Sequence, residues 1–233
     1  MPRTTPPDRF EQVIDAATRV FIELGYRRTQ MEDVAKAAGL AKGTLYLYVE
    51  SKEALFELAL RYADAPRPIQ APSTLPVTTP QKGSTLRALR GRLLEERRAP
   101  ALSTALGRRV AADARAELGA IAHELYWMLY RNRTGIKLID RCAQDYPELA
   151  TVWFQSGRYG LVELLAKYLR SRIRRKALPG VVDVSAASRF VLETIVFWAV
   201  HRHWDPSPQT IDERVAEKLV VDLICRALGA RSR

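Results

Sequence analysis

Apolar residues recur at spacings of three and four along most of the chain, which is the period of an amphipathic helix. The first such stripe comprises Val13, Ile14, Ala17, Val20, Phe21 and Leu24. Gly25 marks its end, and Thr29 and Glu32 stand at capping-box spacing for a second helix. Further short helices are expected over about 41–48 and from Ser51. No segment alternates apolar and polar residues as a strand does, so the sequence predicts an all-α protein.

A proline-rich segment interrupts this helical pattern after about residue 62. Residues 66–80 hold five of the thirteen prolines. Each proline lacks an amide donor and disfavours helix at the residue before it. We therefore expect one domain over 1–62, a Pro-rich linker or loop over 63–84 and a second domain over 85–233. The pattern leaves open whether the middle segment is a flexible linker or a packed loop.

The helical period resumes at about residue 85 and continues almost to the end of the chain. The predicted spans are 85–98, 101–132, 134–144, 147–176, 185–204 and 209–229. The last two are apolar around most of their circumference, so each must be buried on several sides. The pattern alone allows two interpretations, the core of a monomer or an interface with a second copy.

Residues 29–52 have the spacing of a helix-turn-helix. Ala35 stands where the two helices would cross, Gly39 in the turn, and Leu45 as the apolar anchor of the second helix. In such a unit the second helix enters the major groove of DNA. Candidate DNA-contacting residues combine cations, hydroxyls and positions close to the bases: Thr29, Gln30, Ala41, Lys42, Gly43, Thr44, Tyr46, Leu47, Tyr48 and Lys52.

These candidates have different expected roles. Tyr46 and Lys52 suit phosphate contacts, because a phosphate accepts hydrogen bonds and attracts cations. Thr44 and Leu47 are placed for base contacts, and Gly43 lets the backbone approach the DNA closely. Leu47 cannot hydrogen-bond a base edge, so it would read sequence through an apolar contact such as a thymine methyl group.

The string from Ala41 to Phe56, AKGTLYLYVESKEALF, resembles the recognition-helix signature of the TetR family of bacterial transcriptional regulators. The family pattern also places Phe21, Gly25, Thr29, Ala35, Ala38, Gly39 and Leu40 as they stand here. The resemblance covers about residues 8–62. It departs at Ala41, which is often Ser, at Leu47, often His or an aromatic residue, and at Val49, often Phe. It implies a three-helix DNA-binding domain followed by a larger helical domain for ligand binding and dimerisation.

The resemblance further implies a ligand-responsive repressor that binds a palindromic double-stranded DNA operator as a homodimer and is released by an unidentified small-molecule effector. Dimer contacts are then expected on helices 185–204 and 209–229, through Phe190, Phe197, Trp198, His201, Leu219 and Leu223. The candidate effector pocket comprises aromatic residues, for which core packing is the alternative: Tyr126, Trp127, Tyr130, Trp153, Phe154 and Tyr159. The alternative function is a small-ligand carrier or an enzyme that retains the helix-turn-helix as a structural element.

Other classes of site find little support. No nucleophile–base pattern, phosphate loop or pair of catalytic carboxylates stands out, so we expect no enzyme and no catalytic residues. The only two cysteines, Cys142 and Cys225, exclude a disulfide scaffold. His201 and His203 point to different sides of a helix, so we expect no metal or cofactor. Apolar runs reach six residues where a membrane span needs about twenty, and the start lacks a signal core, so a cytoplasmic location without membrane contact is expected.

The formal net charge of +11 does not lie in the helix-turn-helix. Residues 1–62 hold nine basic and nine acidic residues, whereas residues 81–176 hold twenty basic and nine acidic. DNA binding is therefore predicted from the placement of a few residues, and the surplus hints at an anionic effector or at long-range attraction to DNA. One basic cluster closes the 147–176 helix, where solvated cations would complement its dipole: Arg170, Arg172, Arg174, Arg175 and Lys176.

Overall fold

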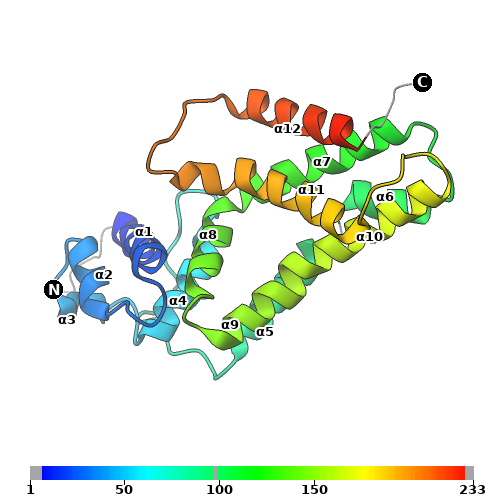
Figure 1. The fold of residues 1–233 in the computed structure, drawn as a ribbon. Coiled ribbons are helices and arrows are strands. Elements are labelled where there is room, and N and C mark those ends of the chain that lie inside the picture. Colours follow the sequence, from blue (N-terminus) through cyan, green and yellow to red (C-terminus); the bar gives the residue numbers. More distant parts are fainter. Residues whose placement is uncertain (1–6, 97–98, 229–233) are drawn as a thin grey trace. The chain divides into compact units, whose positions relative to one another are not determined.

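The computed structural model describes residues 7–96 and 99–228. Within them every regular element is helical (Figure 1), and the only extended pairing is an isolated β-bridge, so the predicted all-α class is confirmed. The chain packs as two compact units, Met1–Arg90 with Thr134–Trp153 and Gly91–Arg133 with Phe154–Arg233. We call them the N-terminal unit and the C-terminal unit. None of the described helices has the length and apolar character needed to cross a bilayer.

The N-terminal unit is built on two long helices packed against each other. Its helices are α1 (Pro7–Leu24), α2 (Met31–Ala37), α3 (Lys42–Leu45), α4 (Lys52–Tyr62), the start of α5 (Ser84–Glu96), nearly all of α8 (Arg133–Cys142) and α9 (Pro147–Val152). The predicted stripe of α1 is buried against α4, and the Phe21 ring meets the Phe56 ring edge-on at 5.1 Å between centroids. Burial of such side chains is the main source of stability in a unit of this size.

Several helix boundaries follow the prediction and two do not. Gly25, with φ 84°, ends α1, and the Ser51 hydroxyl caps α4 by accepting from the amide of Ala54 at 3.2 Å. The predicted capping pair of Thr29 and Glu32 is wrong. Gln30 occupies the N-cap instead, and its amide donates to Asp33 at 2.8 Å. The Thr29 hydroxyl donates to the carbonyl of Gly25 at 2.6 Å, because the last carbonyls of α1 lack helical partners. The third helix, α3, is also a single turn rather than the predicted 41–48.

The proline-rich loop, residues 66–83, packs on the N-terminal unit. Ile69 is buried, and its amide donates to the Glu11 carboxylate at 2.7 Å. Val77 forms the isolated β-bridge with Val49. The prolines deprive the loop of helical hydrogen bonds, and the amides of Ile69, Val77 and Thr79 find acceptors on α1 and after α3. The question left open by the sequence is thereby answered in favour of a packed loop.

Helices α8 and α9 pack with the N-terminal unit although they come much later in the chain. The Asp145 carboxylate accepts hydrogen bonds from the amides of Tyr26 and Arg27, at 3.1 and 3.2 Å. Asp64 likewise accepts from the amide of Gly135 at 2.7 Å. Two carboxylates therefore cap backbone amides across large sequence separations, which local sequence patterns do not reveal.

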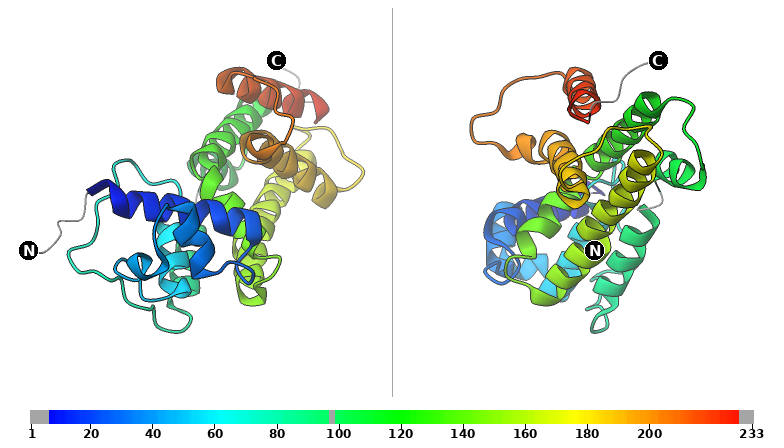
Figure 2. Two further views of the ribbon diagram at one scale, coloured as in Figure 1. Left: turned by 90° about the vertical axis from the view of Figure 1, so that its left-hand side faces the viewer. Right: turned by 45° about the vertical axis from the view of Figure 1, so that its right-hand side comes forward.

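The C-terminal unit is a bundle in which α7 packs on α11 and α12, and α10 packs on α11 (Figures 1 and 2). Its elements beyond α5 are α6 (Pro100–Gly107), α7 (Ala114–Arg131), η1 (Trp153–Arg158), a π-helical segment that begins at the boundary of the units, α10 (Tyr159–Arg174), α11 (Val184–Ala199), the 3-10 turn η2 (His201–Trp204) and α12 (Glu213–Ala227). The predicted single helix 101–132 is wrong. It breaks before Asp113, whose carboxylate caps α7 by accepting from the amides of Arg115 and Ala116 at 2.8 and 3.0 Å.

The C-terminal unit has a buried ion pair at its centre. Arg172 on α10 is 1% exposed, and its guanidinium donates to both oxygens of Glu117 on α7, at 2.6 and 2.9 Å. It also donates to the carbonyl of Ala105 on α6 at 2.6 Å. The hydrogen bonds to Glu117, together with its negative charge, raise the pKa of Arg172 against the opposing effect of burial. The prediction that Arg172 is a solvated cation is wrong, because this face of α10 is covered by α6 and α7.

Candidate DNA-binding surface

The helix-turn-helix has the geometry predicted from its spacing. Gly39 adopts φ 65°, a left-handed conformation that favours glycine, and turns the chain after α2. The amide of Leu40 then donates to the carbonyl of Ala35 at 2.8 Å. Ala35 and Leu45 are both buried, so α2 and α3 are held against each other by small and apolar side chains.

Seven of the ten predicted DNA-contacting residues remain accessible to solvent, Thr44 only partly: Gln30, Ala41, Lys42, Gly43, Thr44, Tyr46 and Leu47. Leu47 is 66% exposed and Tyr46 41% exposed. A Cβ at position 43 would meet no atom within 4 Å, so the fold itself does not require glycine there. An exposed leucine beside an open glycine suits a surface that another molecule covers.

Thr29 and Tyr48, by contrast, are buried. The Thr29 hydroxyl is engaged with Gly25, as described above. Tyr48 follows α3 and packs inside the unit, while its carbonyl accepts from the proline-rich loop. The structure therefore gives the side chains of these two residues a place in the fold rather than on the accessible surface.

Lys52, predicted to contact phosphate, is occupied within the unit. Its ammonium donates to the carbonyls of Tyr26, Arg27 and Thr29 at 3.1, 3.4 and 3.3 Å. It also lies 4.7 Å from the centroid of the Tyr26 ring. Lys52 thus neutralises the carbonyl end of the turn between α1 and α2, and this geometry does not support a phosphate contact.

The ring of Tyr26 joins this turn to α4 and α9. It stacks on Tyr146 with 4.7 Å between centroids, and its hydroxyl donates to Glu53 at 3.3 Å. Burial, with the Glu53 charge, raises the pKa of the Tyr26 phenol, which stays protonated and able to donate. The turn that positions α2 is therefore held by an aromatic and ionic cluster.

Two arginines that the sequence interpretation did not single out lie in the same turn. Arg27 and Arg28 are exposed in the turn before α2, where a helix-turn-helix can meet the DNA backbone. The available signal was the pair of adjacent cations ahead of Thr29. Lys42, the nearest cation on α3, is also exposed and stands 3.9 Å from Glu32.

Three of the residues predicted for the effector pocket belong to α7 and pack toward the end of the C-terminal unit where α12 begins. Tyr126 is buried, and its hydroxyl donates to Glu213 at 2.5 Å. Trp127 and Tyr130 meet edge-on at 5.4 Å between centroids. These contacts give the three rings packing partners.

The other three lie around the π-helical segment. Trp153 belongs to the N-terminal unit, where its indole donates to Asp140 at 3.4 Å. Phe154 and Tyr159 belong to the C-terminal unit and are ring neighbours at 6.2 Å. None of the six rings lines the cavity described next, so their role toward an effector stays a prediction.

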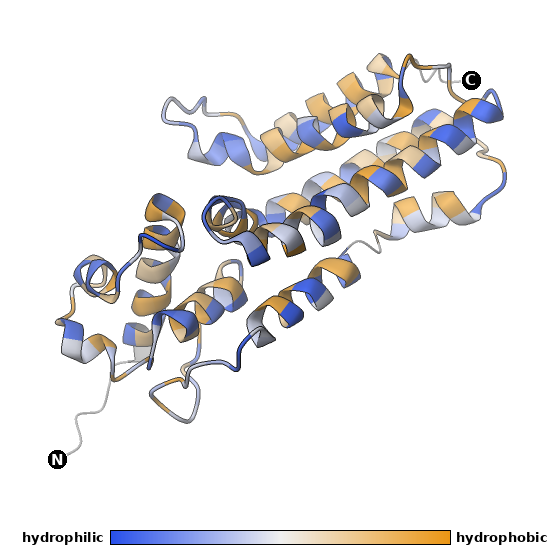
Figure 3. Ribbon diagram, turned by 60° about the horizontal axis from the view of Figure 1, so that its bottom comes forward, coloured by the Kyte–Doolittle hydropathy of each residue, from blue (hydrophilic) through white to orange (hydrophobic). Residues whose placement is uncertain are grey.

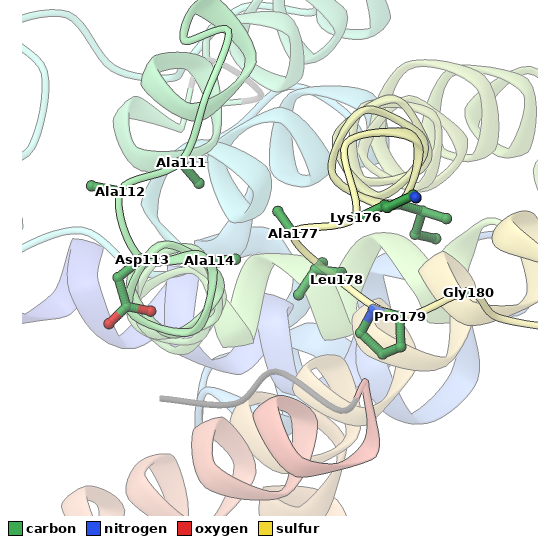
Figure 4. A pocket seen from close by; sticks show the side chains of 10 residues that line it. Ala111, Ala112, Asp113, Ala114, Lys176, Ala177, Leu178, Pro179 and Gly180 are labelled. Atoms are coloured by element: carbon green, nitrogen blue, oxygen red, sulfur yellow. The ribbon is translucent and has the colours of Figure 1, made fainter. Parts of the chain in front are cut away.

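A cavity of about 660 Å³ opens in the C-terminal unit between the segment before α7 and the chain that follows α10 (Figure 4). Polar and apolar atoms share its surface about equally, although most of the residues that line it are small or apolar: Ala111, Ala112, Ala114, Ile173, Ala177, Leu178, Pro179 and Gly180. Asp113 and Lys176 complete the lining, and Lys176 has φ 58°, which residues other than glycine rarely adopt. Of the basic cluster that closes α10, Lys176 alone lines this cavity.

Apolar side chains are exposed at helical spacing on the last two helices. The ribbon coloured by hydropathy shows hydrophobic residues along the helices of this unit (Figure 3). Four of the six residues predicted for the dimer interface are exposed: Phe190 and Phe197 on α11, and Leu219 and Leu223 on α12. Trp198 and His201 are half-buried. Val215, on the same side of α12 as Leu219, extends the stripe. No cluster of three or more potential metal ligands occurs among residues 7–96 and 99–228.

The geometry defines a helix-turn-helix, and comparison with known proteins identifies its family. Residues 13–59 match the model of the bacterial regulatory proteins of the tetR family. The fatty acid metabolism regulator protein of Bacillus subtilis is 49% identical over 45 residues, which cover 19% of this chain and 23% of that protein. The DNA-binding domain of this chain belongs to the TetR family of bacterial transcriptional regulators.

The sequence matches to such curated relatives extend over 45 to 50 residues and span about a quarter of the relatives' length. Similarity of fold extends further. The ketosteroid regulator KstR2 of Mycobacterium tuberculosis matches with a TM-score of 0.54 at 16% identity, over 97% of this chain and 95% of that one. FadR from Bacillus subtilis in complex with stearoyl-CoA matches with a TM-score of 0.50 at 20% identity, over 96% and 100%. At such identities the comparison shows a shared fold.

Proposed function

We propose that this chain is a transcriptional repressor that binds a palindromic operator as a homodimer and is released by a small-molecule effector. The observation that carries the proposal is the accessible strip on and after α3, where Lys42, Gly43, Tyr46 and Leu47 are exposed while Leu45 anchors the helix from below. An α3 placed in the major groove would bring Leu47 to base edges and Tyr46 to the backbone.

The homodimer is supported by the exposed stripes of α11 and α12. Phe190 and Phe197 are seven residues apart, and Leu219 and Leu223 are four apart, so each pair lies on one face of its helix. Apolar stripes left in water cost free energy, which a second copy packed against them would recover. Two chains joined in this way would present two α3 helices, one from each N-terminal unit, to the two half-sites of a palindrome.

The effector is proposed to carry both apolar and polar groups, since atoms of both kinds share the lining of the cavity. The 660 Å³ cavity is large enough for a small molecule and has alanine, isoleucine and leucine in its walls. The FadR structure contains stearoyl-CoA, and KstR2 is described as a ketosteroid regulator. We therefore take a long-chain acyl-CoA and a steroid as the first two effectors to test.

DNA binding is tested by fluorescence anisotropy with DNA taken from upstream of the gene. Leu47→Ala should weaken binding about tenfold and change the preferred sequence at one position of each half-site. Leu94→Ala is the matched control, because Leu94 is 42% exposed on α5 and belongs to the C-terminal unit. Absence of binding by the wild-type chain at low salt would refute the proposal, as would Leu47→Ala and Leu94→Ala behaving alike.

A second pair of variants tests the approach of the backbone to DNA. Gly43→Ala adds one methyl group into open space, so the free protein should fold normally while operator binding falls. Gly91→Ala adds the same group into equally open space on α5 and should leave binding unchanged. Equal operator affinities for the two variants would contradict a close approach at position 43.

The dimer is tested by Leu219→Glu with Val110→Glu as the control, since Val110 is 70% exposed in the segment between α6 and α7 of the same unit. Leu219→Glu should yield monomers in light scattering and weaken operator binding by roughly a hundredfold or more. The reason is that the second DNA-binding domain is then no longer linked to the first and must bind its half-site independently. A wild-type chain that is monomeric at micromolar concentration would overturn this part of the proposal.

Titration of the protein–operator complex with the two effectors separates a regulator from a small-ligand carrier. In a regulator the effector lowers operator affinity, since the two sites are coupled through the protein. A carrier would bind the acyl-CoA or steroid with no change in DNA affinity, and that result would count against effector release.

A further inference from the structure

The proline-rich loop lies outside the helix-turn-helix, yet it runs along the edge of that motif. We propose that this loop is a second part of the DNA-binding surface, in which Lys82 neutralises a backbone phosphate beside the first turn of α4. The inference rests on the proposed function, because it concerns the same complex with DNA. It assigns to the loop the phosphate contact that the sequence had suggested for Lys52.

The loop is hydrogen-bonded to residues 48–50, which follow α3. The amide of Val77 donates to the carbonyl of Tyr48 at 2.8 Å, and the amide of Glu50 donates to the carbonyl of Val77 at 3.0 Å. These two hydrogen bonds place the loop beside the backbone that directly follows the exposed Tyr46 and Leu47. Any DNA backbone that meets the end of this segment therefore passes close to the loop.

The next stretch of the loop is attached to the start of α4. The amide of Thr79 donates to the Glu50 carboxylate, and its hydroxyl donates to the hydroxyl of Ser51, both at 2.9 Å. Beyond Lys82, the Thr85 hydroxyl donates to Glu57 at 2.6 Å. Because the loop is fixed at both ends of this stretch, ordering it on DNA would cost little conformational entropy.

The charges around α4 explain why a further cation is needed there. Glu50 and Glu53 are exposed at the start of α4, and both would repel a phosphate. Lys52 is occupied by three carbonyls, as shown above. Lys82 is exposed and forms no ion pair within the described residues, and together with Glu53 it lines a hollow of about 190 Å³. Lys82 thus supplies a positive charge close to the start of α4, where Lys52 had been expected to contact a phosphate.

A second cation stands next to Lys82. Gly83 has φ 77°, and a Cβ placed on it would lie 3.2 Å from the guanidinium of Arg87. The Arg87 side chain, exposed like that of Lys82, therefore lies beside the residue that follows Lys82 at the junction of the loop and α5. Two exposed cations at this junction suit the sequence-independent part of DNA binding.

The test measures DNA binding of full-length Lys82→Gln and Lys82→Arg variants over a range of salt concentrations. Lys82→Gln should bind operator and unrelated DNA about tenfold more weakly. The slope of log affinity against log salt should fall by about 0.9 for each phosphate that is no longer neutralised, hence by about two per dimer. Lys82→Arg should retain most of the affinity, because the positive charge remains.

Lys167→Gln is the control, since Lys167 is exposed on α10 in the C-terminal unit. Thermal unfolding of each variant should match that of the wild type. If the wild type binds operator and Lys82→Gln shows the same affinity and salt slope, the loop has only a structural role and the inference is wrong. If the wild type itself binds no DNA, the proposed function fails instead. The two failures are therefore distinguishable.

Discussion

One lysine in the N-terminal unit and one arginine in the C-terminal unit resemble surface cations in the sequence and are both used inside the fold. Lys52 donates to three backbone carbonyls at the turn after α1 and stays half-buried. Arg172 donates to a carboxylate and a carbonyl and is almost completely buried. The first cation stabilises a helix end, whereas the second holds three helices together.

The two cations differ in whether water can reach their hydrogen-bond partners once the cation is removed. The carbonyls that Lys52 satisfies lie near solvent, so water can replace the ammonium. The carboxylate of Glu117 is largely enclosed, with 12% of its side chain exposed, so it would remain as a buried and uncompensated charge. Cations of equal appearance in the sequence therefore differ in their contribution to the free energy of unfolding.

The largest expected effect is that of Arg172→Ala. It should lower the free energy of unfolding by about 3–5 kcal/mol, because Glu117 is left without its partner. Urea or guanidinium denaturation of the purified chain measures this loss. Arg170→Ala is the control, since Arg170 is exposed on the same helix and its removal should change stability by no more than about 0.5 kcal/mol.

A double variant refines this prediction. Arg172→Met with Glu117→Leu removes both charges and keeps the volume, so it should recover most of the stability lost in Arg172→Ala. If Arg172→Ala were as mild as Arg170→Ala, Arg172 could not be the central connection of the C-terminal unit.

Lys52→Ala should have an intermediate effect. We expect a loss of about 1–2 kcal/mol in the free energy of unfolding, because hydrogen bonds from a charged donor are replaced by hydrogen bonds from water. The same denaturation experiment measures it. Unchanged stability combined with a uniform loss of DNA affinity would show instead that Lys52 contacts phosphate, and the comparison with Arg172 would no longer hold.

The smallest effect on stability is expected for Lys42→Ala. Lys42 and Glu32 form an exposed pair at 3.9 Å, with side chains 56% and 77% exposed, so the free energy of unfolding should change by less than about 0.5 kcal/mol. DNA affinity should nonetheless fall several-fold, because this cation is free to meet a phosphate. Calorimetry and anisotropy on the same preparation check both parts. A loss of stability without a loss of affinity would reverse the assignment of the two lysines.

The helix-turn-helix could be predicted because its determinants lie close together in the chain. Gly25 and Gly39 adopt positive φ where the pattern predicts turns, and Ser51 caps the helix that follows it. These signals act over a few residues, and local geometry largely decides their outcome. Thr29 shows the limit of such signals, because its hydroxyl was captured by the end of α1 rather than by the start of α2.

The C-terminal unit was predicted less well for a related reason. The break before Asp113 has a capping signal, but the apolar period runs on across it, and period alone does not locate a break. The aromatic residues of α7 gave a plausible pocket, yet Tyr126 is committed to Glu213, 87 residues away in the chain. Which of several candidate partners a side chain meets depends on how the helices pack.

The sequence by itself determined the all-α class and the helix-turn-helix, because spacing, turn residues and caps act locally. Only the tertiary structure decided that the proline-rich loop is hydrogen-bonded to the segment after α3 and that α8 and α9 pack with the N-terminal unit. It also decided that Lys52 and Arg172 are held by partners within the fold. These features depend on contacts between residues up to more than a hundred positions apart, as for Asp145 and Tyr26. Such contacts form only where packing brings a donor and an acceptor within hydrogen-bonding distance.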